Sequence, residues 1–222
     1  QCDWSSDVCS SDLGYHRLFC HRAFEVIRPV KLIILWLGTI AGQGSAIAWC
    51  SIHRGYHHRY ADTDKDLHSP KQGIIHSYIL WMFKYTKISI RSTVNLQRDN
   101  DLVFAHKYYL PILWCSHAIV ALISFKIWLF LMAIPALLTL HCFLIQTSLT
   151  HVGILGYRNF KLKDDSVNVW WLWPSILGEC WHNNHHRFPR QQNFGVKWWE
   201  LDPTAWIIKI IRKNIDKTQT IK

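Results

Sequence analysis

Nine of the fourteen histidines in this sequence fall into short groups, and their spacing is the first feature that could do chemistry. On a helix, residues three to five positions apart point in roughly the same direction, so each group could present several imidazoles to one centre. Imidazole nitrogen is a ligand that suits iron, zinc and copper. The grouped histidines are His16, His21, His53, His57, His58, His151, His182, His185 and His186.

Burying these nine imidazoles without partners would be costly. Each unpaired buried polar group costs about 1–3 kcal/mol, and the sum would rival the whole stability of a domain, about 5–15 kcal/mol. A shared metal centre removes this cost, so the groups predict metal ligands. The remaining histidines stand singly and are interpreted as ordinary core or surface residues: His68, His76, His106, His117 and His141.

The acidic residues restrict the kind of metal centre. Carboxylate-bridged diiron proteins need about four acidic ligands, whereas the glutamates of this chain are Glu25, Glu179 and Glu200. A zinc hydrolase needs only three or four ligands in total. Nine nitrogens divide naturally between two metal ions of five or six coordination, with positions left for water or dioxygen. The pattern therefore favours a histidine-rich diiron centre.

The positive charge of the chain is explained by its position relative to an apolar stretch. The formal net charge is +10, yet Lys126 is the one charged residue between positions 110 and 145. About 20 apolar residues cross a bilayer, so this stretch is long enough for two helices, with Lys126 at the turn between them. Both flanks are then cytoplasmic by the positive-inside rule, and no nucleic-acid partner is expected.

Residues 32–52 form a second apolar stretch that is long enough to span a membrane. Its middle is small and polar, and a crossing would separate His16 and His21 from His53, His57 and His58. We therefore expect this stretch to lie on the membrane surface. The sequence predicts an all-α integral membrane protein, in which a transmembrane helical hairpin carries a cytoplasmic helical cap that holds the metal ions.

Three further segments lie outside the histidine groups. Trp170, Trp171 and Trp173 are interpreted as an anchor at the membrane interface. Residues 206–213 predict a basic amphipathic helix on the membrane surface, with docking of an electron carrier as the alternative. Residues 1–13 repeat a Ser-Ser-Asp pattern without apolar periodicity, so we interpret them as non-native sequence outside the fold.

Three motifs together resemble the histidine boxes of membrane fatty acyl desaturases of the stearoyl, delta-9 type. They are GYHRLFCHR at 14–22, WCSIHRGYHHRY at 49–60 with the aspartates of 62–66, and GECWHNNHH at 178–186. The resemblance implies that the nine grouped histidines bind two ferrous ions and that dioxygen is the cosubstrate. It also implies a cis double bond made in a saturated acyl chain, with electrons from a separate cytochrome b5 or ferredoxin.

Other positions follow from the same resemblance. Thr147 stands where the family often has an asparagine that holds a metal-bound water, and we expect Glu179 and Asn184 to orient ligand imidazoles. Animal acyl-CoA enzymes have an Arg-Asp pair at the position of Ser51 and Ile52, so acyl-CoA and other acyl carriers both stay open. The family has an apolar hairpin before the first box, so residues 14–222 are expected to be a desaturase domain that lacks its first transmembrane hairpin and is poorly active.

Two other functions remain open on the sequence. A diiron hydroxylase of acyl or alkyl chains would use the same scaffold, and a non-catalytic metal-binding membrane protein would use the same ligands. For the desaturase, we expect membrane lipid around the hairpin and an active site on the cytoplasmic face of a bacterial inner membrane or the endoplasmic reticulum.

Overall fold

The fold is entirely helical in the part of the chain that the structure, a computed structural model, describes, residues 10–84 and 86–213. No β-strand occurs in these ranges, where two isolated bridges join Asn168 to Tyr157 and to Trp181. The predicted all-α class is therefore confirmed for the described residues.

Short helices alternate with three longer ones along the chain. In order, the elements are η1 (Ser10–Cys20), α2 (Arg28–Ile40), α3 (Ala46–Ile52), η2 (His53–His57), α4 (His58–Tyr60), η3 (Pro70–Gln72), α5 (Ile74–Tyr78), η4 (Leu80–Phe83), α6 (Ile90–Thr93), α7 (Asn100–Lys107), α8 (Tyr109–Ile123), α9 (Phe125–Trp128), η5 (Leu129–Ala133), α10 (Ile134–Leu149), η6 (Gly153–Leu155), η7 (Trp170–Leu172), α11 (Trp173–Ile176), η8 (Leu177–Cys180), α12 (His182–Arg187) and α13 (Pro203–Ile211).

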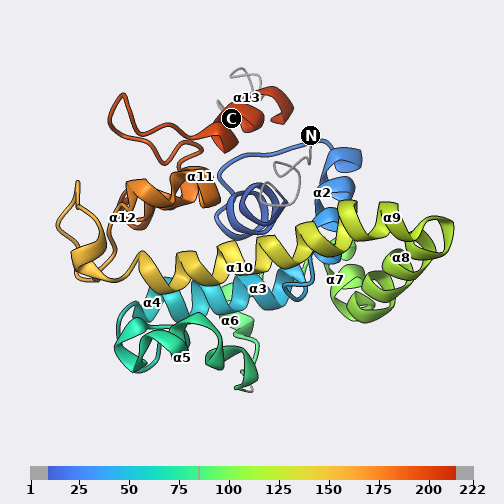
Figure 1. Ribbon diagram of the computed structural model, residues 1–222, viewed down its shortest axis with the longest axis horizontal. Helices are drawn as coiled ribbons and strands as arrows, with labels where there is room; N and C mark the ends of the chain where they lie inside the picture. Colours follow the sequence, from blue (N-terminus) through green and yellow to red (C-terminus); the bar gives the residue numbers. More distant parts are fainter. Residues whose placement is uncertain (1–9, 85, 214–222) are drawn as a thin grey trace, which may run out of the picture.

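Helix α10 runs through the middle of the molecule along its long axis and links its two ends (Figure 1). Helices α8 and α9 lie around the beginning of α10, whereas α11 and α12 lie beside its other end. Together α9, η5 and α10 form one 25-residue helix, Phe125–Leu149, which is long and apolar enough to cross a membrane. It is the one such helix among the described residues.

The predicted hairpin is present, with its turn at Ser124. The backbone of Ser124 is extended, and its hydroxyl accepts a hydrogen bond from the Ile127 amide at 3.3 Å, which starts the next helix. The apolar helix before the turn, α8, has 15 residues, none of them buried. Leu122, for example, is 87 % exposed. The hairpin itself is therefore confirmed, and its two membrane crossings stay a prediction.

Residues 32–52 do not form one spanning helix. Helix α2 ends at Ile40 and α3 begins at Ala46, and the linker contains Gly42 and Gly44 with φ of +75° and +87°. Such positive φ values suit glycine, which has no Cβ to clash with the backbone. This agrees with the expectation that the stretch does not cross the bilayer as a single helix, and its place on the membrane surface remains a prediction.

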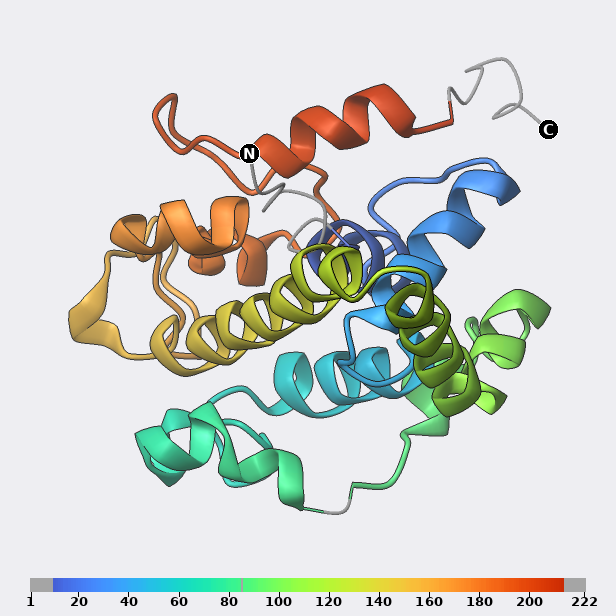
Figure 2. The ribbon, with the colours of Figure 1, turned by 45° about the vertical axis from the view of Figure 1, so that its right-hand side comes forward.

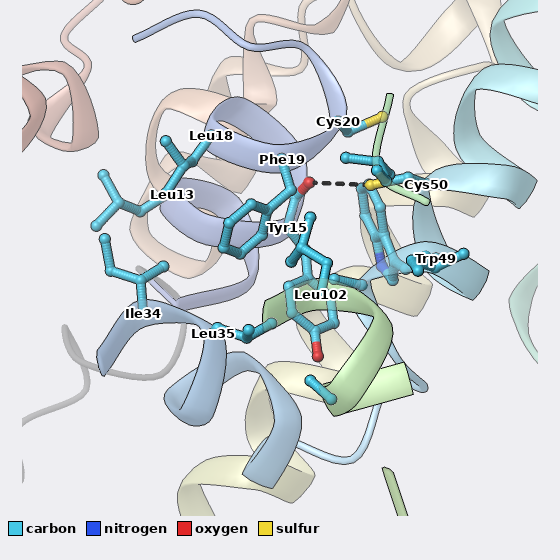
Figure 3. Close-up of a cluster of buried hydrophobic side chains, with 14 of the residues drawn as sticks. Leu13, Tyr15, Leu18, Phe19, Cys20, Ile34, Leu35, Trp49, Cys50 and Leu102 are labelled. Atoms are coloured by element: carbon cyan, nitrogen blue, oxygen red, sulfur yellow. Dashed lines mark hydrogen bonds between the residues drawn. The ribbon is translucent and has the colours of Figure 1, made fainter. Parts of the chain in front are cut away.

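The main core joins the first two histidine boxes. Tyr15 and Phe19 of η1 pack with Trp49 and Cys50 of α3, and the Cys50 thiol donates to the Tyr15 carbonyl at 3.6 Å (Figure 3). Gly38 of α2 lies directly against the Tyr15 ring, where an added Cβ would be 2.4 Å from a ring carbon. The core therefore fixes η1 between α2 and α3.

The chain ends of the described fold meet near η1. Helix α13 packs on η8 and η1, with Ile208 fully buried (Figure 2). Leu13 belongs to the core, and the Asp12 carboxylate accepts a 2.6 Å hydrogen bond from Arg17. Positions 1–9 lie outside the described residues. The expectation that residues 1–13 lie outside the fold is therefore wrong for 10–13, which form the first turn of η1. The non-native origin of the segment stays a prediction.

Candidate metal centre

The first two histidine boxes are wound as π-helices, and this winding decides which imidazoles meet. In η1 the His21 amide donates to the His16 carbonyl at 2.9 Å, and the His58 amide donates to the His53 carbonyl at the end of η2. Hydrogen bonds across five residues widen the turn, so residues five apart face the same side. The side chains of His16 and His21 therefore lie on the same side of η1, and those of His53 and His58 lie on the same side of η2.

Five imidazoles gather into a cluster that we call site A. Its members are His16, His21, His53, His58 and His185, whose candidate ligand nitrogens all lie within 4.8 Å of one another. The Nε2 atoms are neighbours: His16 to His185 at 3.1 Å, His21 to His53 at 3.0 Å, His53 to His58 at 2.9 Å, and His58 to His185 at 3.0 Å.

The other four grouped histidines form site B. Its members are His57, His151, His182 and His186, again with candidate ligand nitrogens within 4.8 Å of one another. The Nε2 atoms of His57 and His186 are 3.2 Å apart, and those of His182 and His151 are 3.1 Å apart. His182 and His186 are one α-helical turn apart in α12 and share site B, while His185 between them reaches site A. All nine histidines predicted from the sequence therefore lie in two adjacent sites.

The Nε2 separations are those of ligands on one metal ion. Two nitrogens bound at right angles, each about 2.1 Å from a first-row metal ion, lie about 3.0 Å apart. The measured separations run from 2.9 to 3.2 Å. The imidazoles are thus already placed at ligand spacing, without further closure of the helices.

Four of the nine imidazoles are held from behind by carboxylates. The Nδ1 atoms pair as follows: His16 with Glu179 at 2.8 Å, His57 with Asp66 at 3.1 Å, His151 with Asp62 at 2.9 Å, and His186 with Asp164 at 3.3 Å. Such partners fix the tautomer and ring orientation of a metal ligand. The position of Glu179 agrees with the orienting role expected for it.

Sequence reasoning missed the three aspartates. Asp62 and Asp66 lie in the run that follows the second box, so their place in that motif was an available signal. Asp164 lies in a loop between the apolar helix and the third box, where no spacing pointed to it. Its partner His186 is distant in the chain, and only the tertiary fold joins them.

The carboxylates leave the Nε2 atoms of site B available to a metal ion. Asp66 and Asp164 face Nδ1 of His57 and His186, so the opposite ring nitrogen of each histidine, Nε2, points into site B. These two Nε2 atoms are 3.2 Å apart. A neutral imidazole that donates from Nδ1 offers a lone pair at Nε2, so the residues present fit a bound metal ion.

Burial favours the neutral state, in which imidazole binds metal, for His16, His185 and His186. It lowers the pKa of His16 to about 3 and that of His186 to about 4. It also lowers the pKa of His185 well below the usual value, and the Coulombic effect of neighbouring histidines adds to this shift. For Asp66, burial acts to raise the pKa, but the nearby His57 imidazole outweighs it and holds that pKa well below its usual range.

The two other orienting residues expected from the sequence have different surroundings. The Asn184 carboxamide donates to the Phe194 carbonyl at 2.9 Å and to Glu200 at 2.8 Å, and it accepts from Asn159 at 2.9 Å. It therefore binds α12 to the following loop, and its described hydrogen bonds reach no imidazole. The Thr147 hydroxyl donates to the Leu144 carbonyl at 3.1 Å and lies at the edge of the cavity between the sites.

His68 is closer to the centre than its interpretation as an ordinary histidine suggests. Its ring is buried, 4.6 Å from the His57 ring, and its Nδ1 lies 3.7 Å from the Asp66 carboxylate. Asp66 thus lies between two imidazoles. The Asp62–Asp66 run, two residues before His68, was the signal that could have pointed to this position.

One narrow cavity reaches both sites. It is bordered by His16 and His53 of site A and by His57 and His182 of site B. Its apolar walls are Trp49, Cys142, Phe143 and Ile176, and its other polar walls are Ser11, Asp12, Thr139, Gln146, Thr147 and Glu179. Its volume of about 30 Å³ gives room for water-sized molecules between the two groups of imidazoles.

Comparisons with known proteins agree with this geometry. A sequence model of the fatty acid desaturase family matches residues 8–216. The chain is 36% identical over 205 residues to "Delta-9 acyl-lipid desaturase 2" of Arabidopsis thaliana, covering 89% of this chain and 65% of that protein. It is 32% identical over 215 residues to "sn-1 stearoyl-lipid 9-desaturase" of Anabaena variabilis, covering 94% of this chain and 77% of that protein.

The family predicted from the three boxes is therefore confirmed. The matched region contains every box, both sites and the helix between them, and the identity extends over most of the chain rather than over isolated motifs. On the combined evidence of fold, histidine sites and sequence similarity, the chain belongs to the fatty acid desaturase family.

Proposed function

We propose that this chain forms the catalytic centre of an acyl desaturase that introduces a cis double bond, at the delta-9 position, into a saturated fatty acyl chain. Family membership and the delta-9 names of relatives support the reaction and the position. The observation that carries the proposal is the cluster of four imidazoles in site B, in which the Nε2 atoms of His57 and His186 are 3.2 Å apart, a spacing that fits a bound cation. Site A, with five imidazoles at ligand spacing, fits a second.

Two iron ions bound in the sites would activate dioxygen to an oxidant strong enough for an unactivated C–H bond. The reaction removes one hydrogen atom from each of two adjacent methylenes and leaves a double bond between them. The two hydrogen atoms, together with two electrons and two protons from outside, reduce dioxygen to two waters. Nine histidines would hold the ions: His16, His21, His53, His58 and His185 in site A, and His57, His151, His182 and His186 in site B.

The protein's own part in this reaction is positioning. An acyl chain between the two sites would lie against Trp49, Phe143 and Ile176, and these side chains would have to move apart because the cavity between them has a volume of only about 30 Å³. Glu179, Asp62, Asp66 and Asp164 would keep the imidazoles oriented as the charge on the metals changes.

The partners proposed for this activity follow from its chemistry. Two electrons for each double bond must arrive from outside, and a separate cytochrome b5 or ferredoxin fits that need. The substrate is carried as acyl-CoA or on another acyl carrier. The names of relatives, which refer to acyl-lipid and stearoyl-lipid substrates, favour a chain esterified in a membrane lipid.

The exposed apolar surface of the hairpin supports a location in a membrane. Trp114 is 66 % exposed and Leu122 is 87 % exposed, and contact of these side chains with water is unfavourable. We propose that both arms of the hairpin enter the bilayer and that the histidine sites lie on the cytoplasmic side. The residue at the turn, Lys126, would then reach the far interface.

Expression in a host that lacks its own desaturase, followed by mass spectrometry of its fatty acids, tests the reaction. A product lighter than the substrate by two hydrogen atoms is expected, and His185→Ala should abolish it because His185 belongs to site A. His141→Ala is the matched control, since His141 lies outside both sites. Retention of the product in His185→Ala would refute the metal assignment.

The same experiment separates the two alternatives. A product heavier than the substrate by one oxygen atom would indicate a hydroxylase on the same scaffold. Two iron ions per chain with no lipid product, in the presence of oxygen and a competent electron donor, would indicate a metal-binding protein without this catalysis.

A further inference from the structure

A tryptophan-lined groove opens on the surface beside the third histidine box. Its volume is about 650 Å³, and its walls are Trp170, Trp171, Trp173, Pro174, Trp181, Trp199 and Leu201. The indole N–H groups of Trp173 and Trp181 both donate to the Leu201 carbonyl at 2.8 Å, so these two rings are fixed. The groove is therefore a preformed surface of fixed aromatic side chains.

The groove has a short route to site B. Trp199, 37 % exposed, contacts Trp181 edge to face with ring centroids 5.6 Å apart. Trp181 is 2 % exposed and directly precedes His182 in the chain. The Nε2 atom of His182 lies in site B, 3.1 Å from that of His151. Two touching indoles thus connect solvent with a candidate metal ligand.

The groove lies at the end of the hairpin opposite its turn. The indole of Trp171 donates to the carbonyl of Leu155, a residue that follows the end of α10. Helix α11, which carries Trp173, lies at this end of α10, and α8 and α9 lie at the other (Figure 1). A protein that arrives from the aqueous side can reach the groove while the hairpin stays in lipid. The membrane anchor expected for Trp170, Trp171 and Trp173 stays a prediction, and the experiment below distinguishes it from a docking role.

An exposed lysine gives the edge of the groove a positive charge. The Lys197 ammonium lies 5.6 Å from the Trp199 ring centroid and 4.8 Å from that of Tyr157. The carboxylates of the same loop, Glu200 and Asp202, are buried and hydrogen-bonded. The uncompensated Lys197 would attract an acidic protein and speed its association.

We propose that this groove is the docking surface for an acidic one-electron carrier protein, with Trp199 and Trp181 as the contact between the carrier and site B. The inference rests on the proposed desaturase function, which needs two electrons for each double bond. Each docked carrier is oxidised by one electron, and two successive encounters reduce two ferric ions to ferrous ions. Small aromatic interfaces with a charged rim suit such transient encounters.

Electron transfer without substrate tests the proposal. The iron-loaded ferric protein in lipid nanodiscs is mixed without oxygen with reduced cytochrome b5 or reduced ferredoxin, and oxidation of the carrier is followed by stopped-flow absorbance. We expect Lys197→Glu and Trp199→Leu each to lower the second-order rate about tenfold for the preferred carrier. Raising the ionic strength should lower the wild-type rate and affect Lys197→Glu less.

Matched controls separate docking from damage. Lys209→Glu makes the same charge change at an exposed position of α13, the helix for which carrier docking was the alternative role. This variant should react at a rate near that of the wild type. Trp206→Leu is the matched control for Trp199→Leu, because it removes an indole that is 57 % exposed on α13. Reduction of the iron by dithionite, a small reductant that needs no docking, should be equal in all variants.

Wild-type rates of carrier oxidation in Lys197→Glu and Trp199→Leu, with both carriers, would overturn the docking proposal. A decrease in this rate confined to Lys209→Glu would also overturn it. Weaker binding of Trp199→Leu to vesicles of anionic lipid, with unchanged carrier oxidation, would assign the groove to the membrane and also overturn it. A chain that binds no iron would instead contradict the proposed function.

Discussion

Asp62→Asn should weaken metal binding at site B while leaving the fold and site A intact. The Asp62 carboxylate accepts hydrogen bonds from His151 Nδ1 at 2.9 Å and from the Asp165 amide at 2.6 Å. Burial acts to raise the pKa of Asp62, but the hydrogen bond from His151 outweighs it and lowers that pKa, so the group is a carboxylate at neutral pH. Asparagine keeps the shape and an acceptor oxygen but removes the charge.

The magnitude follows from the role of that charge. Loss of a partner behind a metal-bound histidine costs 10- to 100-fold in metal affinity, or about 1.4–2.7 kcal/mol. Asp62 has a φ of +60°, a backbone conformation that asparagine tolerates better than alanine. Asp62→Ala would add strain of about 1–2 kcal/mol and leave His151 Nδ1 without its carboxylate, so its loss of affinity should be larger.

Titration with ferrous ion against a colorimetric chelator measures both sites. We expect the wild type to bind two ions tightly and Asp62→Asn to bind one tightly and one 10- to 100-fold more weakly. Asp64→Asn is the control, because Asp64 is exposed on the same loop. Equal weakening of both ions would indicate general damage, and unchanged affinity at both sites would refute the role assigned to Asp62.

Gly38→Ala should destabilise the protein by about 1–3 kcal/mol in thermal unfolding, because its Cβ would lie 2.4 Å from the Tyr15 ring. Gly153→Ala, with its nearest contact at 3.8 Å, should leave the midpoint unchanged. Asn184→Ala should cost about 1–3 kcal/mol by leaving buried partners unpaired, which denaturant unfolding would measure. In the metal-free protein, burial lowers the pKa of His16 to about 3, so the unfolded state binds more protons below about pH 6.5. Its stability should therefore fall on acidification, by up to about 1.4 kcal/mol per pH unit for each such histidine, and a flat profile of unfolding free energy from about pH 7 to 5 would contradict this.

Much of the candidate site could be predicted from local spacing. The clustering of the histidines in three short motifs indicates their ligand role, but His16 with His21, and His53 with His58, are five residues apart, an offset of about 140° on an α-helix. The spacing did not reveal that both boxes are π-helical, because the wider turn depends on packing around η1 and η2 that no single segment contains. That winding places His58 in site A while its neighbour His57 enters site B.

The supporting residues were harder to predict. Asp164 lies on a loop without periodicity, and its contact with His186 comes from the fold of the segment between α10 and α12. Asn184 is next to two ligands in sequence, yet its side chain points to Glu200 and the following loop. Neighbouring positions on a short helix face different sides, so adjacency in the chain does not determine which side chain supports a ligand.

The sequence by itself determined the family, the helical class, the apolar hairpin with its turn near Lys126, and the identity of the nine grouped histidines. These properties follow from residue type and short-range periodicity, which are local. Only the tertiary structure decided how the nine divide into five and four, which carboxylates stand behind them, and where the tryptophan groove meets site B. Such relations join segments far apart in the chain, as His16 and His185 show, and they depend on packing that local patterns do not encode.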